Sequence, residues 1–554
     1  MAGRDWVGWP VADADRYRSL KYWTGVTFGD LLRDWAARYD QRTALVDGAR
    51  RWTYAQLDQA VDRLVTGLHQ LGIRRGDRVI VQLPNRAEFV EVWFALQRLG
   101  AVPVHAMPGH RRAEITHLAQ VSGAVAYVIA DRHAGFDFRT LAAQVREARQ
   151  DADEPLRHVI VIGDPGQSGF VSYADLSTVA PGQPLPPDGP APSDLALLLL
   201  SGGTTGLPKL IPRSHDDYAY NARASAELCG LGSDTVYLAV LPIAFNFTLA
   251  CPGVLGTLTS GGTVVVTASP DPQTAFSLIE REGVTCTALT PPLVPYWLEG
   301  YQESRPDLSS LRFVQVGGAR LDDDLARRLE ATLGTRLQQV YGMAEGLLNY
   351  TRLDDPDELV HTTQGRPLCP DDEVRVVDPA DDQPVAPGES GELLTRGPYT
   401  LRGYYRATAD ATSFTPDGFY RTGDLVRQLP SGHLVVTGRI KDQINRGGEK
   451  IAATEVEELL LTHPSVRLAA LIAAPDDEWG EVPVAVLVCD GSPPTARDVA
   501  DFLRTRGLAA FKLPHRVECL DALPLTPLGK IDKKRLTAMF AQPQSTPPST
   551  VPPT

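Results

Sequence analysis

Residues 198–209 read Leu-Leu-Leu-Ser-Gly-Gly-Thr-Thr-Gly-Leu-Pro-Lys, an apolar run that breaks into a loop of glycines and hydroxyl residues and ends on Lys209. Glycines let backbone N–H groups approach an anion closely, hydroxyls add donors, and a lysine brings a mobile positive charge. The loop is not a Walker A motif, because two residues separate Gly206 from Lys209, which that motif has side by side. The pattern predicts a phosphate-binding loop, with an ordinary glycine- and serine-rich surface loop as the alternative.

Length, charge and cysteine content narrow the class of protein. A chain of 554 residues is expected to form two or more folded units. Its composition, 43% hydrophobic and 22% charged, is typical of a soluble globular protein, and no apolar run is long enough for a membrane span. The first residues lack a secretory signal and the six scattered cysteines lack metal-binding spacing, so we expect free thiols in a reducing cytoplasm. A net charge of −14 argues against a nucleic-acid partner and favours a small ligand.

Helical patterns and short apolar runs alternate on both sides of the loop. Strands are expected near 78–83, 124–130, 236–240 and 262–266. This alternation predicts an α/β fold. Residues 181–192 are crowded with proline and glycine, which predicts a surface connector just ahead of the loop.

The C-terminal region has a pattern of its own. Helices are expected at 453–461, which stops before Pro464, and around 499–506; strands are expected at 466–473, 484–489 and 516–519. These elements predict a compact α+β unit. From about Gln542 the chain is rich in Pro, Ser and Thr, so we expect a disordered tail.

Two acidic residues follow glycine-containing stretches. Glu345 comes after the strand-like run 338–343, where a carboxylate can hold Mg²⁺ if phosphate oxygens complete the site; a lone loop glutamate is otherwise ordinarily solvated. Asp424 lies behind Gly423 in a predicted tight turn, where it can accept two hydrogen bonds from a ribose diol. A side-chain turn that caps the next segment is the alternative for Asp424.

Together with the run Pro-Leu-Thr-Pro-Leu-Gly-Lys at 524–530, these stretches resemble the core motifs of the adenylate-forming superfamily: acyl-CoA synthetases, luciferases and the adenylation domains of non-ribosomal peptide synthetases. The resemblance spans about residues 20–540. It implies a large N-terminal adenylation domain of layered sheets and helices over 1–438, a small mobile α+β lid domain over 439–541, and a tail over 542–554. The implied hinge lies near 439–442, and catalysis is expected in the cleft between the domains.

The resemblance also implies roles at the matching positions. Lys530, Lys209 and Glu345 would be catalytic, with the lysines neutralising phosphate charge and Glu345 ligating Mg²⁺; a solvated surface charge is the alternative for Lys530. The implied ATP-binding residues are Ser201, Gly202, Gly203, Thr204, Thr205, Gly206, Gly318, Ala319, Tyr341, Gly342, Asp424 and Arg439. The residues implied to form the hinge and a tunnel for a thiol are Lys441, Gly447, Gly448 and Lys450.

Three further stretches, at 211–218, 241–253 and 346–353, are similar to the stand-alone aryl acid ligases of siderophore and peptide-antibiotic pathways. In those relatives the asparagine that matches Asn246 bonds the ortho hydroxyl of the acid, whereas domains that activate amino acids carry an aspartate there for the ammonium group. The resemblance therefore implies an aryl carboxylate as substrate. The implied aryl pocket comprises Phe245, Asn246, Phe247, Cys251, Gly317, Val340 and Leu348.

Three of these positions bear on which acid is used. The pair Cys251 and Leu348 is similar to that of salicylate ligases, whereas 2,3-dihydroxybenzoate ligases tend to have Ser and Val at these two positions. The alternative is that both residues serve only to pack the core. Phe245 departs from the family, which has His there. The entrance to the pocket is thus less polar, and ligases for 3-hydroxyanthranilate, 3-hydroxypicolinate or 2,3-dihydroxybenzoate remain alternatives.

The implied reaction is the ATP-dependent activation of a salicylate-like ortho-hydroxy or ortho-amino aryl acid to its aryl-AMP. The acyl group would then pass to the phosphopantetheine thiol of an aryl carrier protein or to CoA, and this acceptor is expected in trans because only a short tail follows the small domain. An aliphatic acyl-CoA synthetase would need a long apolar tunnel in place of a pocket closed by Asn246 and Phe247. A catalytically dead binding protein would not be expected to keep the charged residues of the motifs.

Overall fold

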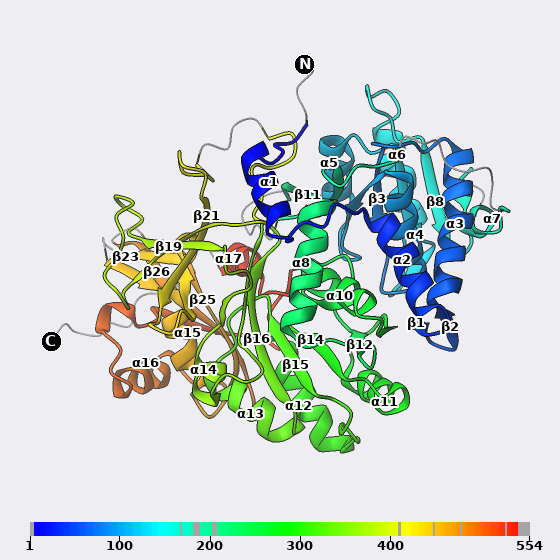
Figure 1. Ribbon diagram of the computed structural model, residues 1–554. Helices are drawn as coiled ribbons and strands as arrows, with labels where there is room; N and C mark the ends of the chain where they lie inside the picture. Colours follow the sequence, from blue (N-terminus) through cyan, green and yellow to red (C-terminus); the bar gives the residue numbers. More distant parts are fainter. Residues whose placement is uncertain are drawn as a thin grey trace.

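The computed structural model describes residues 5–166, 169–180, 189–201, 208–407, 412–446, 449–476, 479–526 and 529–540. Figure 1 shows a large N-terminal domain of layered sheets and helices and a smaller C-terminal domain, drawn in orange and red, beside it. The predicted α/β fold with a second, smaller domain is therefore confirmed. Residues 202–207 of the phosphate loop, 181–188 of the connector and the predicted tail lie outside the described residues.

A seven-stranded sheet carries the start and end of the phosphate loop. Its strands are β3 (Arg78–Gln82), β4 (Val102–His105), β5 (Ala126–Ala130), β8 (His158–Ile162), β9 (Val171–Ser172), β10 (Leu195–Leu200) and β11 (Leu210–Ser214). The order is β11-β10-β4-β3-β5-β8-β9, parallel throughout except for the antiparallel pair β10 and β11. The central strands are buried on both faces, which explains why their sequences are continuous apolar runs.

A nine-stranded sheet forms the other half of the N-terminal domain. Its strands are β1 (Thr43–Asp47), β2 (Arg50–Thr53), β12 (Val236–Ala239), β13 (Thr263–Val266), β14 (Cys286–Leu289), β15 (Phe313–Gly317), β16 (Arg336–Met343), β17 (Leu347–Tyr350) and β18 (Arg366–Pro367). The order is β18-β17-β16-β15-β14-β12-β13-β1-β2; the six strands from β16 to β1 are parallel to one another, and the strands at both ends of the sheet pair antiparallel. The predicted strands of both sheets agree with the structure to within two residues at their ends.

Helices cover these sheets, and Figure 1 shows α8 between the two halves of the domain. Helix α3 illustrates how the sequence sets them: a capping box of Thr53 and Gln56 begins it, an apolar stripe from Leu57 to Leu68 is buried, and Gly72 ends it in the left-handed region. The helices of this domain are α1 (Val11–Ser19), α2 (Phe28–Tyr39), α3 (Tyr54–Leu71), α4 (Ala87–Leu99), α5 (Arg112–Ser122), α6 (Phe138–Ala148), α7 (Tyr173–Ser177), α8 (His215–Leu228), α9 (Asn246–Ala250), α10 (Gly253–Thr259), α11 (Pro272–Glu282), α12 (Leu293–Ser304), α13 (Asp323–Leu333) and α14 (Asp357–Thr362). Strands β6 (Arg132–His133) and β7 (Phe136–Asp137) form a separate small hairpin.

An antiparallel sheet of four strands follows: β19 (Glu373–Val377), β20 (Ser390–Arg396), β21 (Tyr420–Gln428) and β22 (Leu434–Arg439). The tight turn expected at Gly423 is wrong, because Gly423 lies inside β21 at φ +68°, where the register with β20 shifts between Glu392 and Leu394. The strand keeps pairing on both sides, so a β-bulge takes the place of the turn. The register of β21 with β22 then sets Arg439 directly opposite Asp424.

The C-terminal domain is built on a five-stranded sheet. Its strands are β23 (Gln443–Arg446), β24 (Glu449–Ala452), β25 (Val466–Asp476), β26 (Gly480–Cys489) and β27 (Arg516–Cys519), and its helices are α15 (Ala453–Leu461), α16 (Ala496–Thr505) and α17 (Lys533–Phe540). Val456, Leu460 and Leu503 bury one face of the sheet, and Leu536 of α17 buries the other. The predicted α+β unit is confirmed; it also contains α17, which the sequence patterns did not predict.

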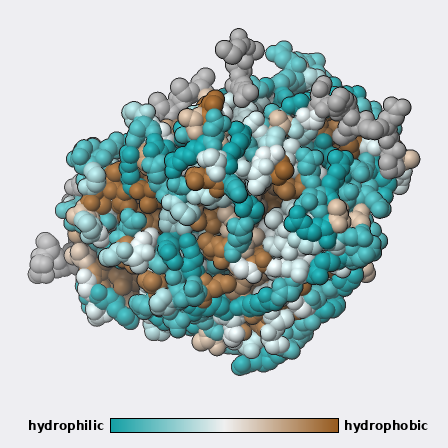
Figure 2. Space-filling model, in the orientation of Figure 1, coloured by the Kyte–Doolittle hydropathy of each residue, from teal (hydrophilic) through white to brown (hydrophobic). Residues whose placement is uncertain are grey.

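The visible surface is mostly hydrophilic, with hydrophobic residues in small groups (Figure 2). Within the described ranges, no helix is both long and apolar enough to cross a membrane.

Candidate active site

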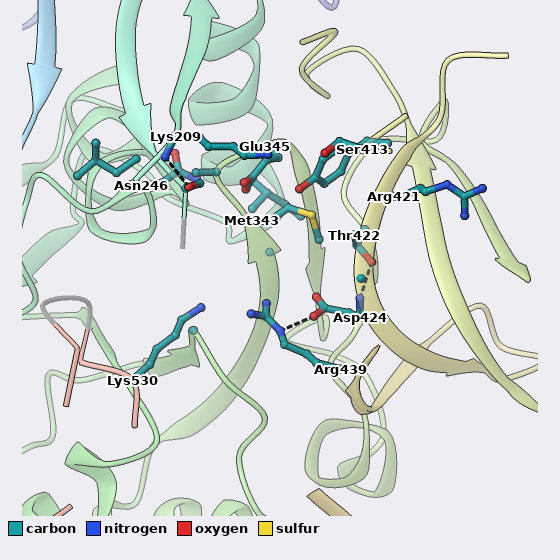
Figure 3. Close-up of a pocket in the computed structure, with 18 of the residues that line it drawn as sticks. Lys209, Asn246, Met343, Glu345, Ser413, Arg421, Thr422, Asp424, Arg439 and Lys530 are labelled. Carbon is teal, nitrogen blue, oxygen red and sulfur yellow. Dashed lines mark hydrogen bonds and ion pairs between the residues drawn. The ribbon is translucent and has the colours of Figure 1, made fainter. Parts of the chain in front are cut away.

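One cavity of about 620 Å³ collects most of the residues singled out in the sequence. Figure 3 shows Lys209, Asn246 and Glu345 along one side, Asp424 and Arg439 on another, and Lys530 entering from the opposite wall. The lining residues are Leu200, Ser201, Lys209, Phe245, Asn246, Phe247, Cys251, Gly318, Val340, Gly342, Met343, Ala344, Glu345, Leu348, Glu392, Tyr404, Thr412, Ser413, Tyr420, Arg421, Thr422, Gly423, Asp424, Arg439, Ile440, Lys441 and Lys530.

The ends of the phosphate loop are fixed to each other. The backbone N–H of Ser201 donates to the Lys209 carbonyl at 3.0 Å, and the Lys209 N–H donates to Ser201 Oγ at 3.0 Å. Lys209 Nζ lies 4.6 Å from the centroid of the Tyr404 ring, where a cation is attracted to the aromatic face. The hairpin of β10 and β11 therefore holds a lysine at the rim of the cavity.

Glu345 sits in the turn between β16 and β17. Gly346 follows it at φ +98°, and a Cβ there would lie 1.9 Å from the Tyr399 carbonyl, so the turn requires glycine. Glu345 is buried, and Tyr404 donates its hydroxyl to Oε1 at 3.1 Å. Burial raises the pKa of Glu345, with Tyr404, Arg439 and Lys530 opposing. A carboxylate in this position is stabilised by any cation that reaches it.

Asp424 is held by one hydrogen bond and one ion pair, from strands of two different sheets. The Tyr341 hydroxyl donates to Oδ2 at 2.7 Å, and Arg439 Nε lies 2.6 Å from Oδ1. Asp424 in turn raises the pKa of Arg439, so the guanidinium stays charged. The pair gives the cavity a rigid acceptor beside a fixed cation.

Lys530 lines the cavity from the far end of the C-terminal domain. Two hydrogen bonds to Thr526 fix its backbone: Thr526 N–H donates to the Lys530 carbonyl at 2.7 Å, and Lys530 N–H donates to Thr526 Oγ1 at 3.2 Å. Desolvation lowers the pKa of Lys530 to about 8, and the Arg439 charge adds to this effect. Ion pairs of Arg320 with Glu458 and of Arg467 with Glu299 join the two domains nearby.

The remaining end of the cavity is apolar except for one amide. Asn246 accepts from the Tyr218 hydroxyl at 2.8 Å through Oδ1 and donates from Nδ2 to Cys251 Sγ at 3.4 Å. The Phe245 and Phe247 rings meet edge to face at 6.3 Å. Gly317 makes room for this arrangement, since a Cβ there would lie 3.1 Å from the Phe247 ring and 2.6 Å from the Val340 carbonyl. The result is a walled pocket that fits a flat ring with one polar substituent.

Some residues singled out in the sequence do not line the cavity. Gly317, Ala319 and Tyr341 are next to lining residues in the chain, and the Tyr341 hydroxyl is hydrogen-bonded to Asp424, which lines the cavity. Gly202, Gly203, Thr204, Thr205, Gly206, Gly447 and Gly448 lie outside the described residues, as does the side chain of Lys450. Lys441 lies on the cavity wall.

Sequence reasoning missed several lining residues. Tyr404 contacts both Glu345 and Tyr420, the latter at 3.0 Å between hydroxyls, and Glu392 accepts from Arg421 at 2.9 Å. Gly403 precedes Tyr404 and Gly391 precedes Glu392, but a single glycine is common in loops and strands and does not by itself indicate a binding residue. Both contacts are long-range: Tyr404 meets Glu345, 59 residues earlier in the chain, and the pairing of β20 with β21 brings Arg421 beside Glu392.

Comparison with known proteins agrees with this geometry. The family model "AMP-binding enzyme" matches residues 32–405, and "AMP-binding enzyme C-terminal domain" matches 455–530. The chain is 52% identical over 535 residues to "2,3-dihydroxybenzoate-AMP ligase" of Bacillus subtilis, covering 96% of this chain and 97% of that protein. It is 51% identical over 538 residues to "Salicyl-AMP ligase / salicyl-S-ArCP synthetase" of Mycobacterium tuberculosis, covering 96% of this chain and 94% of that protein.

A solved structure, the apo form of MbtA from Mycobacterium smegmatis, is 49% identical with a TM-score of 0.74, and the match covers 97% of this chain and 99% of that one. The family models and the relatives thus span both domains that form the cavity. The chain belongs to the AMP-binding enzyme family and is an adenylate-forming ligase.

Proposed function

We propose that this ligase activates a salicylate-like aryl carboxylic acid with ATP and then passes the aryl group to a phosphopantetheine thiol. The observation that carries the proposal is the division of one cavity into a charged part, with Lys209, Asp424 and Lys530, and an apolar pocket that presents the Asn246 amide. The first part suits a nucleotide triphosphate and the second a substituted ring. Two relatives, a 2,3-dihydroxybenzoate-AMP ligase and a salicyl-AMP ligase, are named for acids of this class, which supports the proposal.

In the proposed reaction the acid's carboxylate attacks the α-phosphorus of ATP in line, and pyrophosphate leaves. Both reactants are anions, so the site has to neutralise charge as they approach. Lys209 would face the leaving phosphates and Lys530 the carboxylate and α-phosphate, while Asp424 would accept from the ribose hydroxyls. In a poorly hydrated cavity one well-placed donor contributes about 3–4 kcal/mol to lowering the barrier.

The donor set also suits Mg²⁺. Glu345 is a buried carboxylate whose pKa is raised by desolvation, a penalty that a bound cation relieves. Within the described ranges no group of three or more His, Cys, Asp or Glu side chains forms a metal cage. A single carboxylate fits a magnesium ion that is held mainly by substrate phosphates and water. Bound there, Mg²⁺ would supply positive charge to the phosphates, and Glu345 would be its protein ligand.

For the second half of the reaction we propose an acceptor in trans, an aryl carrier protein or CoA. The name salicyl-S-ArCP synthetase of the Mycobacterium tuberculosis relative supports the carrier protein. Lys441 lines the cavity where the chain passes into the C-terminal domain, which is the position expected for residues that face an incoming thiol. A cytoplasmic location follows the same reasoning, because ATP and carrier proteins are found there.

The proposal is tested by ATP–pyrophosphate exchange over a panel of acids. Salicylate, 2,3-dihydroxybenzoate, 3-hydroxypicolinate, benzoate and an aliphatic acid of equal carbon number would be compared by kcat/KM. We expect the ortho-substituted aryl acids to exceed the aliphatic acid by about 100-fold or more, because a closed pocket with a buried amide rejects a flexible chain. Exchange with the aliphatic acid alone would overturn the proposal.

The pH dependence of adenylation follows from Lys530. Its pKa of about 8 means that the cationic form predominates below pH 8 and falls about tenfold per unit above it. We therefore expect kcat/KM for ATP to decline above about pH 8, measured by pyrophosphate exchange from about pH 6.5 to 9.5. The residual activity of Lys530→Ala should not decline above pH 8. A decline that persists in this variant would show that another group causes it.

The double variant Cys251→Ser with Leu348→Val tests the preference for one hydroxyl over two. Both residues line the cavity, and the exchange adds a stronger hydrogen-bonding group and removes one methylene. Because a methylene-sized change is worth roughly 1–3 kcal/mol, we expect the kcat/KM ratio of 2,3-dihydroxybenzoate to salicylate to rise about 10-fold or more. An unchanged ratio would remove both residues from the specificity argument.

A further inference from the structure

The Asn246 amide has one orientation imposed by its protein neighbours. The buried hydroxyl of Tyr218 lies 2.8 Å from Oδ1, and among the described residues it makes no other hydrogen bond. A buried hydroxyl needs an acceptor for its proton, so Oδ1 must be the atom that faces Tyr218. Burial raises the pKa of Tyr218 well above its ordinary value, which keeps the phenol a donor.

Cys251 favours the same orientation of the amide, with Nδ2 toward its sulfur. Its thiol donates to the backbone carbonyl of Asn246 at 3.4 Å, so Cys251 Sγ is left to accept from Nδ2 at 3.4 Å. Burial raises the pKa of Cys251 to about 12, so the sulfur remains a protonated thiol. A flipped amide would leave the Tyr218 proton without its acceptor, and the Cys251 thiol would have to give up the Asn246 carbonyl to pair with Oδ1.

The Tyr218 ring is itself firmly placed. It lies in the first turns of α8, where Ser214 and Asp217 form a capping box. The Arg213 guanidinium stacks 4.8 Å from the ring centroid and is paired with Asp217 at 2.6 Å. Tyr218 does not line the cavity, whereas Asn246 and Cys251 both do.

From these contacts we propose that the Tyr218 hydroxyl sets the polarity of the acid pocket by holding the Asn246 amide with its NH₂ group toward the cavity. The inference rests on the proposed function and deepens it. Nδ2 carries two hydrogens, and Cys251 Sγ takes one of them. The other is available to a ligand atom, so the pocket offers a donor and selects acids whose ortho atom accepts a hydrogen bond.

This polarity sorts the candidate acids. An ortho hydroxyl or phenolate oxygen and a ring nitrogen both carry an accessible lone pair, so salicylate- and picolinate-type acids are favoured. An ortho aromatic amine has its lone pair delocalised into the ring and presents N–H hydrogens toward the Asn246 donor. Anthranilate-type acids are therefore disfavoured although they match salicylate in size. Tyr218 acts through Asn246 and is a positioning residue.

The test compares salicylate with anthranilate, an isosteric pair, in ATP–pyrophosphate exchange with the full chain. We expect wild type to prefer salicylate by about tenfold or more in kcat/KM, as one mismatched hydrogen bond implies. In Tyr218→Phe the amide loses the hydroxyl that orients it and can flip. The salicylate-to-anthranilate ratio should then fall at least about fivefold, with kcat/KM for anthranilate unchanged or raised.

Tyr54→Phe is the matched control, since Tyr54 is another fully buried tyrosine whose hydroxyl donates to the carbonyls of Leu258 and Gly262. Its ratio should equal that of wild type. In Asn246→Asp, which has no donor, the salicylate preference should disappear. Equal losses for both acids in Tyr218→Phe, or a preserved preference in Asn246→Asp, would overturn the inference. Absence of exchange with every aryl acid in wild type would instead overturn the proposed function.

Discussion

Replacing Lys530 with alanine is expected to lower the rate of aryl-adenylate formation by about 100- to 1000-fold. Thioester formation from supplied aryl-AMP should stay within a few-fold of wild type. The reason is geometric: the C-terminal domain brings Lys530 to the cavity wall, where the attack on ATP is proposed to need an added cation. Once the adenylate exists, the phosphate charge has already been reduced by the loss of pyrophosphate.

The two half-reactions are measured separately, by pyrophosphate exchange and by single-turnover transfer from synthetic aryl-AMP. Lys533→Ala provides the control, because Lys533 is a lysine of the same domain that pairs with Glu457 at 2.7 Å outside the cavity. An ion pair at a partly exposed position contributes about 0–1 kcal/mol, so adenylation by this variant should be near wild type. Equal loss of both half-reactions in Lys530→Ala would contradict the division of labour.

Replacing Asp424 with asparagine is expected to lower kcat/KM for ATP by about 100-fold while leaving the KM of the aryl acid nearly unchanged. The substitution keeps the shape of the side chain but removes the charge that Arg439 faces at 2.6 Å. Truncating one partner of a close charge pair costs about 2–5 kcal/mol, and the ribose would lose its best acceptor as well. Initial rates at varied ATP and varied acid separate the two effects.

A smaller loss of kcat/KM for ATP is expected for Tyr341→Phe, because this substitution removes one hydrogen bond to the Asp424 carboxylate. Asp417→Asn is the control for charge removal, because Asp417 pairs with Arg375 at 2.8 Å on the exposed side of the same region. Thermal unfolding of each variant checks that the fold is intact. A rise in KM for the acid as large as that for ATP would argue that Asp424 supports the whole cavity and not the nucleotide.

Much of the fold was predictable because the spacing of apolar residues and the length of each apolar segment can be read from the local sequence. The predicted bounds of β27 and α15 are identical to those in the structure, and those of β3 and β12 differ by one residue. Each of these elements has a distinct apolar pattern and is flanked by residues that end a strand or helix. The bulge at Gly423 was not predictable, because a glycine with a positive φ fits a turn and a bulge equally well until the partner strand is known. Register is a long-range property that one segment does not encode.

The candidate site shows the same division. Lys209, Glu345, Asp424 and Lys530 were identified because glycine-rich or proline-rich stretches mark them in the sequence. Tyr404 was missed because its role depends on where its hydroxyl arrives after folding, 3.1 Å from Glu345. The residues around Tyr404 in the sequence do not indicate that contact.

The cross-strand pair of Asp424 and Arg439 has a mechanical consequence. Arg439 ends β22, and the 3₁₀ turn Ile440–Asp442 begins the passage into the C-terminal domain. The pair proposed to hold the ribose therefore lies at the end of β22, directly before the chain passes into the C-terminal domain. If the small domain rotates about a point after Arg439, Lys530 would leave the cavity while the aryl-adenylate stayed bound to Asp424. The acceptor thiol could then reach the acyl carbonyl before the adenylate dissociates.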